Sequence, residues 1–229
     1  MKCLPMLIGL TLLPGAALAA DGRNPTVVEL FQSQGCSSCP PALANVNALA
    51  ARPDVLALTF AVTYWDQLGW KDTFASAAFT ARQWEYARAG GRAQVATPQT
   101  IVDGRAVING GNRAELERTV AAARRAGGPA LARSADGRSV TLSAAPAKAS
   151  ATVWVVRYDP RTIAVPIRAG ENGGKTLPHR DVVRSLQAIG NWNGAATRIT
   201  VRPSPNPAWR SAVLVQQGKG GPIIAAGRL

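Results

Sequence analysis

Two cysteines, Cys36 and Cys39, lie where a strand pattern meets a helical pattern, and this junction constrains the fold more than any other feature. Residues 26–31 form a β-branched apolar run that is typical of a buried strand. From Ala42 to Ala50, apolar residues recur at helical spacing. The two prolines after Cys39 are compatible with a helix start, because first-turn amides have no partner within the helix. The sequence therefore predicts a strand that leads through C-x-x-C into a helix.

The following residues extend this pattern into a mixed sheet. A second apolar run predicts another buried strand, and an Asp103-Gly104 turn between two β-branched runs is a strong hairpin signal. Asn112 is the predicted N-cap of a later amphipathic helix. The predicted elements are strand 55–62, helix 73–89, hairpin 99–108 and helix 114–125. This order favours a parallel pair extended by antiparallel strands, with flanking helices.

The pattern changes after a Gly127-Gly128-Pro129 breaker, which predicts a domain boundary. We expect an α/β domain over residues 24–128 and an all-β, sandwich-like domain over residues 129–229, because short apolar runs separated by turns are typical of a sandwich. The predicted strands are 140–142, 152–158, 162–168, 182–189, 196–202, 212–216 and 222–226. Of these, 182–189 is equally compatible with a helix.

The N-terminus resembles a secretory signal. An apolar stretch from Leu4 to Leu18 follows Lys2 and ends in small residues, so residues 1–20 are the predicted signal peptide. An uncleaved anchor is the alternative, but the stretch is short and contains prolines, whereas a span needs about 20 mostly apolar residues. We expect a periplasmic or secreted protein with no membrane span after cleavage.

The formal net charge is +13, and 21 of the 26 basic residues are arginines. These arginines are spread along the chain, and the longest run is Arg124-Arg125. Nucleic-acid binders concentrate such charge on one helix or face, interleaved with aromatics, so no nucleic-acid partner is expected. The charge predicts a solvated surface that anionic envelope lipids would attract.

Cleavage of the signal would remove Cys3 and leave Cys36 and Cys39 with no partner but each other. A helix N-terminus favours a thiolate, and can lower the pKa of a cysteine from ~8.5 to roughly 3.5–7.5. Cys36 would be the attacking thiolate on the solvent side, and Cys39 the buried resolving thiol. This role requires two sulfurs within bonding reach and an accessible site.

Two alternatives remain open for the cysteine pair. The first alternative is an inert Cys36–Cys39 disulfide, although so short a ring restricts the unfolded chain little. The second alternative is a metal site in which the two thiolates are ligands. Its coordination would need His179, the only histidine, or carboxylates from elsewhere.

Further candidate residues lie in two loops. Trp65 and Asp66 follow the second predicted strand, at the sheet end where open α/β folds place ligands, and would wall the cysteine site. Glu171 and His179 lie in and after a Gly-rich loop, and would tune the thiolate if that half packs over the cysteine helix. The structural alternatives are that Trp65 only packs in the core and that His179 is a hydrogen-bonded structural residue.

Four segments together resemble a family of secreted bacterial thioredoxin-like proteins of unknown function: LFQSQGCSSCPP, TYWDQLGWKDTF, TPQTIVDGRAVING and ENGGKTLPHRDVVRSL. The resemblance implies a thioredoxin-like fold over residues 26–126, in which Pro98 is cis and faces the cysteines. It also implies that Thr97 pairs with an extended substrate segment. Thioredoxins carry a buried carboxylate near Glu29, but Glu29 lies one residue further from the first cysteine, which favours a strand-end or Arg-paired residue.

The expected function is that of an extracytoplasmic thiol–disulfide oxidoreductase. It would act on protein thiols or disulfides with an unidentified redox partner, and would need no cofactor beyond its own dithiol. A non-catalytic binding or accessory module, which would handle copper with its thiolates, is the second hypothesis. A structural envelope protein held by one short disulfide is the third.

Overall fold

The computed structural model describes residues 24–124 and 128–229. The predicted signal peptide, Cys3 and Arg125 lie outside these residues. The first half contains four strands and three helices. They are β1 (Thr26–Gln32), α1 (Pro40–Leu49), β2 (Val55–Ala61), α2 (Ala77–Ala89), β3 (Gln99–Val102), β4 (Ala106–Ile108) and α3 (Arg113–Ala122).

The described part of the second half contains strands and no helix. The strands are β5 (Leu131–Arg133), β6 (Ser139–Leu142), β7 (Ala151–Asp159), β8 (Ile163–Pro166), β9 (Thr176–His179), β10 (Val182–Trp192), β11 (Thr197–Thr200), β12 (Arg210–Gln217) and β13 (Ile223–Arg228). The segment with two interpretations, 182–189, belongs to a strand. Its pairing with β7 overrides its helical propensity.

Local signals placed the elements of the first half well. Asn112 caps α3 by accepting a hydrogen bond from the backbone N–H of Glu115 at 3.0 Å. Asp103 and Gly104 both have positive φ, as the predicted two-residue turn between β3 and β4 requires. The helix predicted from residue 73 begins at Ala77, because Ser76 is its N-cap. No helix within residues 24–124 and 128–229 has the length and apolar character needed to span a bilayer.

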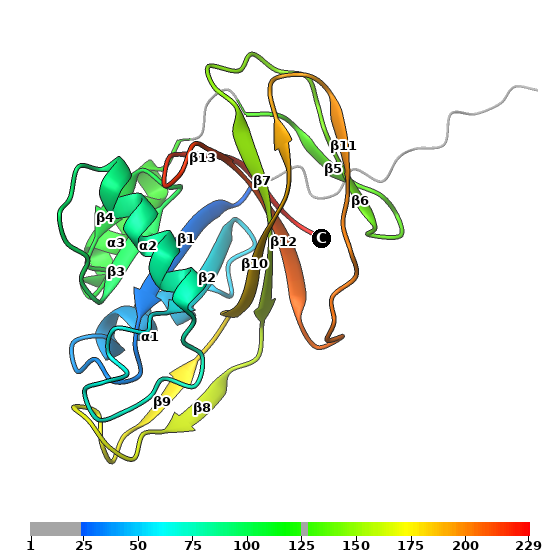
Figure 1. Ribbon diagram of the computed structural model, residues 1–229. Helices are drawn as coiled ribbons and strands as arrows, with labels where there is room; N and C mark the ends of the chain where they lie inside the picture. Colours follow the sequence, from blue (N-terminus) through cyan, green and yellow to red (C-terminus); the bar gives the residue numbers. More distant parts are fainter. Residues whose placement is uncertain (1–23, 125–127) are drawn as a thin grey trace, which may run out of the picture.

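One eight-stranded sheet runs through both halves in the order β13-β12-β7-β10-β2-β1-β3-β4. β1 and β2 are parallel, and β3 joins β1 antiparallel, as the sequence predicted. The two halves meet where β10 pairs in parallel with β2, at Val182 and Thr59. The result is a mixed sheet with further antiparallel strands (Figure 1).

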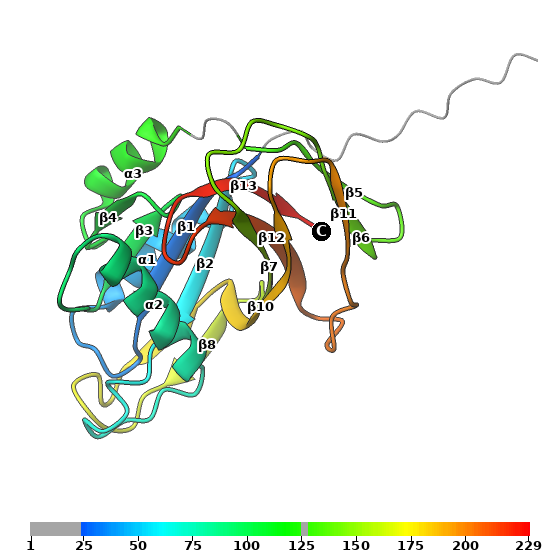
Figure 2. The same cartoon turned by 45° about the horizontal axis from the view of Figure 1, so that its top comes forward.

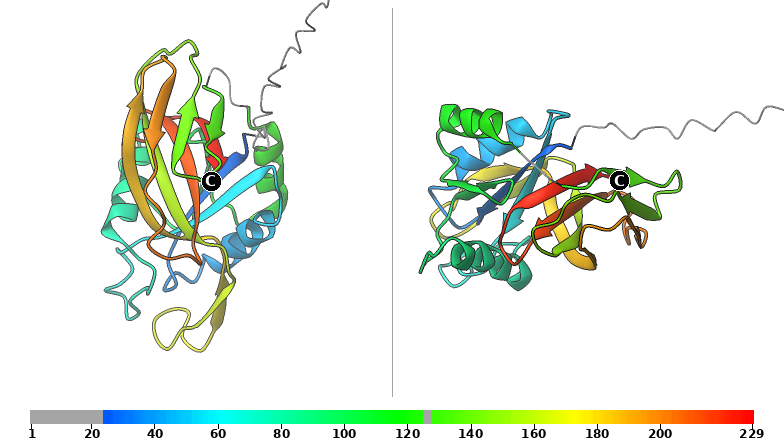
Figure 3. Two further views of the ribbon diagram at one scale, coloured as in Figure 1. Left: turned by 90° about the vertical axis from the view of Figure 1, so that its right-hand side faces the viewer. Right: turned by 90° about the horizontal axis from the view of Figure 1, so that it is seen from above.

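The helices cover both faces of this sheet (Figure 3). α2 lies on one face, where Phe79 and Tyr86 pack against alternate residues of β1, β2, β7 and β12. α1 and α3 lie on the opposite face, over Val28 and Leu30 of β1 and their neighbours. Alternation along the strands thus separates two cores.

A second, three-stranded sheet of order β11-β6-β5 packs on the face that carries α1 and α3, further along the large sheet. Its Val140 and Leu142 contact Val153 and Val155 of β7. A third pair of strands, β8 and β9, forms a hairpin that extends past the end of the large sheet (Figure 2), and β9 contacts α1.

This arrangement corrects the expectation of a separate all-β domain. Four strands of residues 129–229 extend the sheet of the first half, and only β5, β6 and β11 form a facing layer. The breaker at Gly128 is no free linker, since a Cβ there would lie 1.9 Å from the carbonyl oxygen of Ile224 in β13. Turn signals mark where strands end, but do not show which strand pairs with which.

Candidate functional site

The two cysteines form a disulfide at the start of α1. Cys39 is the N-cap of this helix, and the Cα atoms of Cys36 and Cys39 are 5.4 Å apart. Pro40 and Pro41 occupy the first two helical positions, so two of the amides that usually point out of a helix start are missing. The predicted polarisation of this turn therefore rests on Ala42 and on the helix dipole.

Both cysteines are buried, Cys36 with 0% and Cys39 with 1% of its surface exposed. This contradicts the prediction that Cys36 lies on the solvent side. Ser37 and Ser38 are exposed above them, and the Ser38 hydroxyl lies 3.3 Å from the Cys36 sulfur. The sulfurs are within bonding reach, but the protein covers them.

Part of the cover comes from the loop between β8 and β9. Glu171 accepts hydrogen bonds from the Ser37 backbone N–H at 3.0 Å and from the Ser37 hydroxyl at 2.6 Å. These bonds lower the pKa of the Glu171 carboxyl. The side-chain amide of Asn172 donates to the carbonyl oxygens of Gln34 at 2.9 Å and Cys36 at 2.8 Å. Glu171 therefore reaches the cysteine loop, as the sequence suggested.

The β8–β9 hairpin, residues 163–179 with this loop, also docks along α1. Asn47 of α1 donates to the carbonyl oxygen of Pro178 at 2.7 Å and accepts from the backbone N–H of Arg180 at 3.2 Å. Ile167 and Leu177 add apolar contacts to the α1 core. We call residues 163–179 the cap hairpin.

Thr97 and Pro98 lie on another side of the cysteine loop. The Thr97–Pro98 peptide bond is cis, as the resemblance implied, and Pro98 is buried. The Ser38 hydroxyl is 3.4 Å from the Thr97 carbonyl oxygen, and the Trp65 indole N–H donates to the Thr97 hydroxyl at 2.7 Å. Trp65 thus forms part of the wall, as predicted.

Asp66 is linked to the cysteine loop only indirectly, through Asp72. It accepts from the backbone N–H of Asp72 at 3.1 Å, and Asp72 in turn accepts from the backbone N–H of Gln34 at 2.7 Å. Burial raises the pKa of Asp72 to about 6, against these backbone hydrogen bonds. The loop after β2 is in this way fastened to the residues that precede Cys36.

Glu29 points away from the cysteines. It forms a buried ion pair with Arg82 of α2, with Nε and Oε1 2.7 Å apart, and it contacts the Tyr86 hydroxyl. Arg82 also donates to Gln216 of β12 at 3.1 Å. The Arg-paired alternative describes this residue, since the one-residue offset turns Glu29 to the α2 face.

His179 is buried at the end of the cap hairpin, edge-on to Phe74, with 5.5 Å between the ring centroids. Neither ring nitrogen has a hydrogen-bond partner among the described residues, so the hydrogen-bonded alternative is not observed. Burial lowers the pKa of His179 to about 4. No hydrogen bond within those residues links it to the cysteine loop.

Four residues of the site were not identified from the sequence: Gln34, Ser38, Asp72 and Asn172. Each lies inside one of the four segments that carried the family resemblance, and this position was the signal that could have identified them. Within residues 24–124 and 128–229, no three His, Cys, Asp or Glu side chains gather in a metal-binding group.

Comparisons with known proteins place the chain among proteins of unknown role. The family described as "Protein of unknown function (DUF1223)" matches residues 27–216. The structure of protein AGR_C_4864 from Agrobacterium tumefaciens is 30% identical, with a TM-score of 0.73 over 89% of this chain and 93% of that chain. HBP35 of Porphyromonas gingivalis is 10% identical, with a TM-score of 0.51 over 92% and 76%, which is a likeness of fold alone. No significant match was found among curated proteins.

Proposed function

The chain belongs to the DUF1223 family of unknown function, and we propose that it is an extracytoplasmic thiol–disulfide oxidoreductase with a thioredoxin-like redox site. Cys36 and Cys39 are the exchanging pair. Thr97 and Pro98 form the contact for an extended protein substrate. The signal-like residues 1–20 support a periplasmic or secreted location.

One observation carries the proposal: a C-x-x-C disulfide at a helix start lies beside a cis X-Pro bond that begins a neighbouring strand. The Ser38 hydroxyl connects the cysteine loop to the Thr97 carbonyl oxygen. Thr97 is half-buried, so the residue is partly accessible to solvent beside the cysteine loop, where a substrate strand would pair with it.

The exchange balances without a cofactor. A substrate thiolate attacks the Cys36 sulfur, the Cys36–Cys39 bond breaks, and Cys39 leaves with the electron pair and takes up a proton. A second substrate thiolate then attacks the mixed disulfide and releases Cys36 as a thiolate. The substrate dithiol is oxidised to a disulfide and the protein disulfide is reduced to a dithiol. With a reduced protein, the same steps run in reverse.

The cover over the sulfurs makes this exchange a gated one. Much of it is polar: the hydrogen bonds of Glu171 to exposed Ser37, and those of Asn172 to two backbone carbonyls. The Glu171 bonds are exposed and exchange readily with water, because the net contribution of a hydrogen bond is only about 0.5–1.5 kcal/mol. The Asn172 bonds are buried and must break when the hairpin opens. The cap hairpin must move aside before a substrate reaches Cys36.

The burial of both sulfurs favours one competing function, an inert structural disulfide. The two functions differ in whether the bond reacts in the folded protein. We expect the wild-type protein to accelerate insulin reduction by dithiothreitol. Cys36→Ser should abolish this activity, and Cys39→Ser should accumulate a mixed disulfide that intact-mass measurement detects.

The contrary result is equally clear. If the native disulfide resists dithiothreitol for hours in buffer, but is reduced at once in urea, the bond is structural and the oxidoreductase proposal fails. Circular dichroism of each variant checks that the fold is retained.

A further inference from the structure

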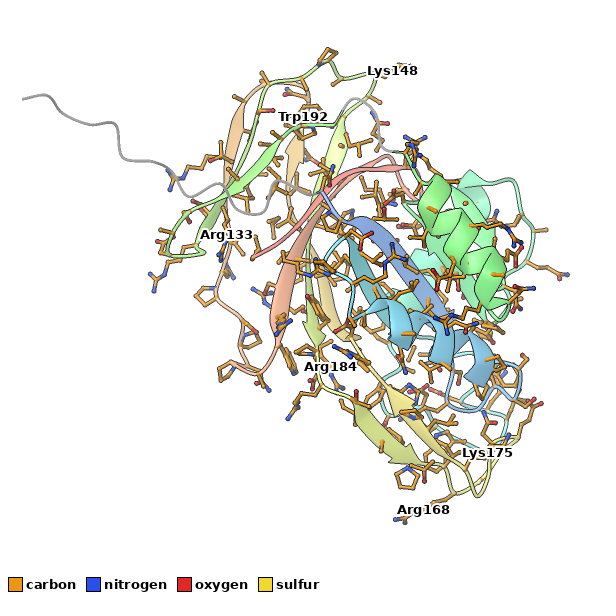
Figure 4. All side chains as sticks on the ribbon, turned by 180° about the vertical axis from the view of Figure 1, so that it is seen from behind. Arg133, Lys148, Arg168, Lys175, Arg184 and Trp192 are labelled. Atoms are coloured by element: carbon orange, nitrogen blue, oxygen red, sulfur yellow. A yellow bond between two sulfur atoms is a disulfide. The ribbon has the colours of Figure 1, made fainter. Side chains whose placement is uncertain are left out.

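A groove of about 950 Å³ opens on one side of the molecule, between the C-terminal end of α1 and the segment that includes β5, remote from the disulfide. One wall is the C-terminal end of α1 with Arg52 and Pro53, and the opposite wall is Pro129 to Arg133, which includes β5. Cys39 caps the first turn of α1, whereas the groove begins beyond its last turn, about 15 Å away for ten residues. Figure 4 shows this face, with α1 and α3 on one side and the small sheet with Arg133 on the other.

The lining of the groove is strongly basic. It contains six arginines and no lysine, against the single acidic side chain of Asp181. The arginines come from segments far apart in the sequence: Arg52, Arg133, Arg161, Arg180, Arg210 and Arg228. The fold has thus gathered in one groove arginines that the sequence spreads evenly.

Only two of these arginines are neutralised locally. Arg52 pairs with Asp54 at 2.7 Å and lies 3.6 Å from Glu117. Arg161 pairs with Asp159 at 2.7 Å. For the other four, the described residues provide no carboxylate within 4 Å.

Two of those four show how the groove is built. Arg228 donates to the backbone carbonyls of Pro53 and Val55, which fixes its guanidinium at the base of the α1 wall. The Nε atom of Arg180 is buried and has no hydrogen-bond partner among the described residues. A buried donor without an acceptor is costly, and an anion bound near the Arg180 guanidinium would offset part of that cost through its charge.

Asp181 is the one acidic side chain in the lining, and it is nearly fully buried. Burial raises the pKa of its carboxyl to about 6, while the charges of Arg180, Arg228 and Arg210 act to lower it. One carboxylate facing three guanidinium groups leaves the groove with excess positive charge.

We propose that this groove binds a small polyanion that carries two or more phosphate or carboxylate groups. Guanidinium forks match the planar or tetrahedral oxygens of such groups with paired hydrogen bonds, which the point charge of a lysine does not. The four arginines without a carboxylate partner come from separate segments of the lining, so one ligand with anionic groups at two places satisfies more of them than a single ion. The volume is that of a small-molecule site.

The test is calorimetric titration of the whole protein with sodium tripolyphosphate and, separately, with citrate, at constant ionic strength. At least one of the two should bind, and the one that binds identifies phosphate or carboxylate as the preferred group. The double variant Arg180→Gln/Arg210→Gln should lose at least tenfold in affinity. Arg168→Gln removes an exposed arginine far from the groove (Figure 4) and should leave the anion affinity unchanged.

A gain-of-affinity variant guards against misfolding as the cause of any loss. Asp181 has φ +48°, a conformation that asparagine also tolerates, so Asp181→Asn should fold and bind the anion severalfold more tightly. The proposal is overturned if neither anion binds the wild type, if Arg168→Gln weakens binding as much as the double variant, or if Asp181→Asn does not bind more tightly. None of these outcomes depends on the reactivity of the disulfide.

Discussion

His179 is an imidazole without a hydrogen-bond partner in the described structure, and its chemistry predicts an acid-sensitive fold. Burial lowers its pKa from 6.5 to about 4. Above pH 6.5 the residue is neutral in both the folded and unfolded states and has no pH-dependent effect. As the pH falls from 6.5 to 4, only the unfolded chain takes up the proton, so the free energy of unfolding drops by about 3 kcal/mol.

We expect His179→Leu to remove this dependence. The difference in unfolding free energy between variant and wild type, from urea titrations at several pH values, should shift by about 3 kcal/mol in favour of the variant between pH 7 and pH 4. Asp72 and Asp181 have raised pKa values, so their contribution is lost as the pH rises through about 6, but both remain in the variant and cancel. A difference that stays constant with pH would contradict the prediction. His179 is the only histidine, so no other imidazole titrates.

At the scale of residues, the sequence predicted the disulfide and the cis peptide bond but not the residues that cover them. The disulfide and the cis bond before Pro98 are where the motifs indicated. The burial of Cys36 was not predictable, because Glu171 and Asn172 come from 134 and 136 residues further along the chain. Glu29 shows the opposite case: its offset by one residue favoured a strand-end or Arg-paired residue, and the structure has the Arg-paired form.

Among the elements, the cap hairpin is the one that we propose as the gate over the disulfide, because its loop binds Ser37 and the Cys36 backbone. Asn172→Ala removes two donors and leaves the buried carbonyls of Gln34 and Cys36 unpaired, at a cost of about 1–3 kcal/mol. If reduction needs the hairpin to open, the rate of Cys36–Cys39 reduction by a phosphine should rise about tenfold. Glu171→Gln removes only the charge of its contact with Ser37 and should give a smaller increase.

Alkylation followed by mass spectrometry measures these rates. Glu115→Gln on α3 is the matched control, and it should leave the rate unchanged. The Glu171 carboxyl has a lowered pKa, so its contact is fully present above about pH 4.5 and is lost as the pH falls through that lowered pKa. The rate of Cys36–Cys39 reduction in the wild type should therefore rise at acid pH, whereas the rate in Glu171→Gln should not change with pH. Equal rates in wild type and Asn172→Ala would exclude the hairpin as the gate.

Prediction of elements succeeded where a pattern was long enough to read. β1, β2 and the β3–β4 hairpin follow their apolar runs closely. β5 is three residues long and β9 contains Pro178, so neither has a strand signature, and both were missed. These two short strands build a wall of the arginine groove and a side of the cap hairpin, so both features were invisible in the sequence.

For the whole molecule, the continuity of the large sheet predicts that the first half does not fold alone. Residues 24–128 would lack β10, which pairs with β2, and the residues of β7 and β12 that cover Leu58 and Phe60. We expect this fragment to aggregate, or to lack a cooperative urea transition, whereas residues 24–229 unfold cooperatively. A monomeric fragment with a cooperative transition would contradict this and would establish residues 24–128 as an independent domain.

The two-domain prediction failed for a physical reason. Composition and turn spacing report which residues form strands, but the pairing of β10 with β2 rests on two segments about 120 residues apart. A parallel pair at that separation leaves no local signal. The apolar runs therefore indicated most of the strands, but not that four strands of the second half join the sheet of the first.

The separation between Ser37 and Glu171 also has a consequence for biosynthesis. During translation, the cysteines emerge 134 residues before the carboxylate that covers them. At about 5–20 residues per second, the nascent pair stays uncovered for roughly 7–27 seconds. A cellular oxidase can form the Cys36–Cys39 disulfide within that time, so its formation does not require the cap hairpin of the folded protein to open.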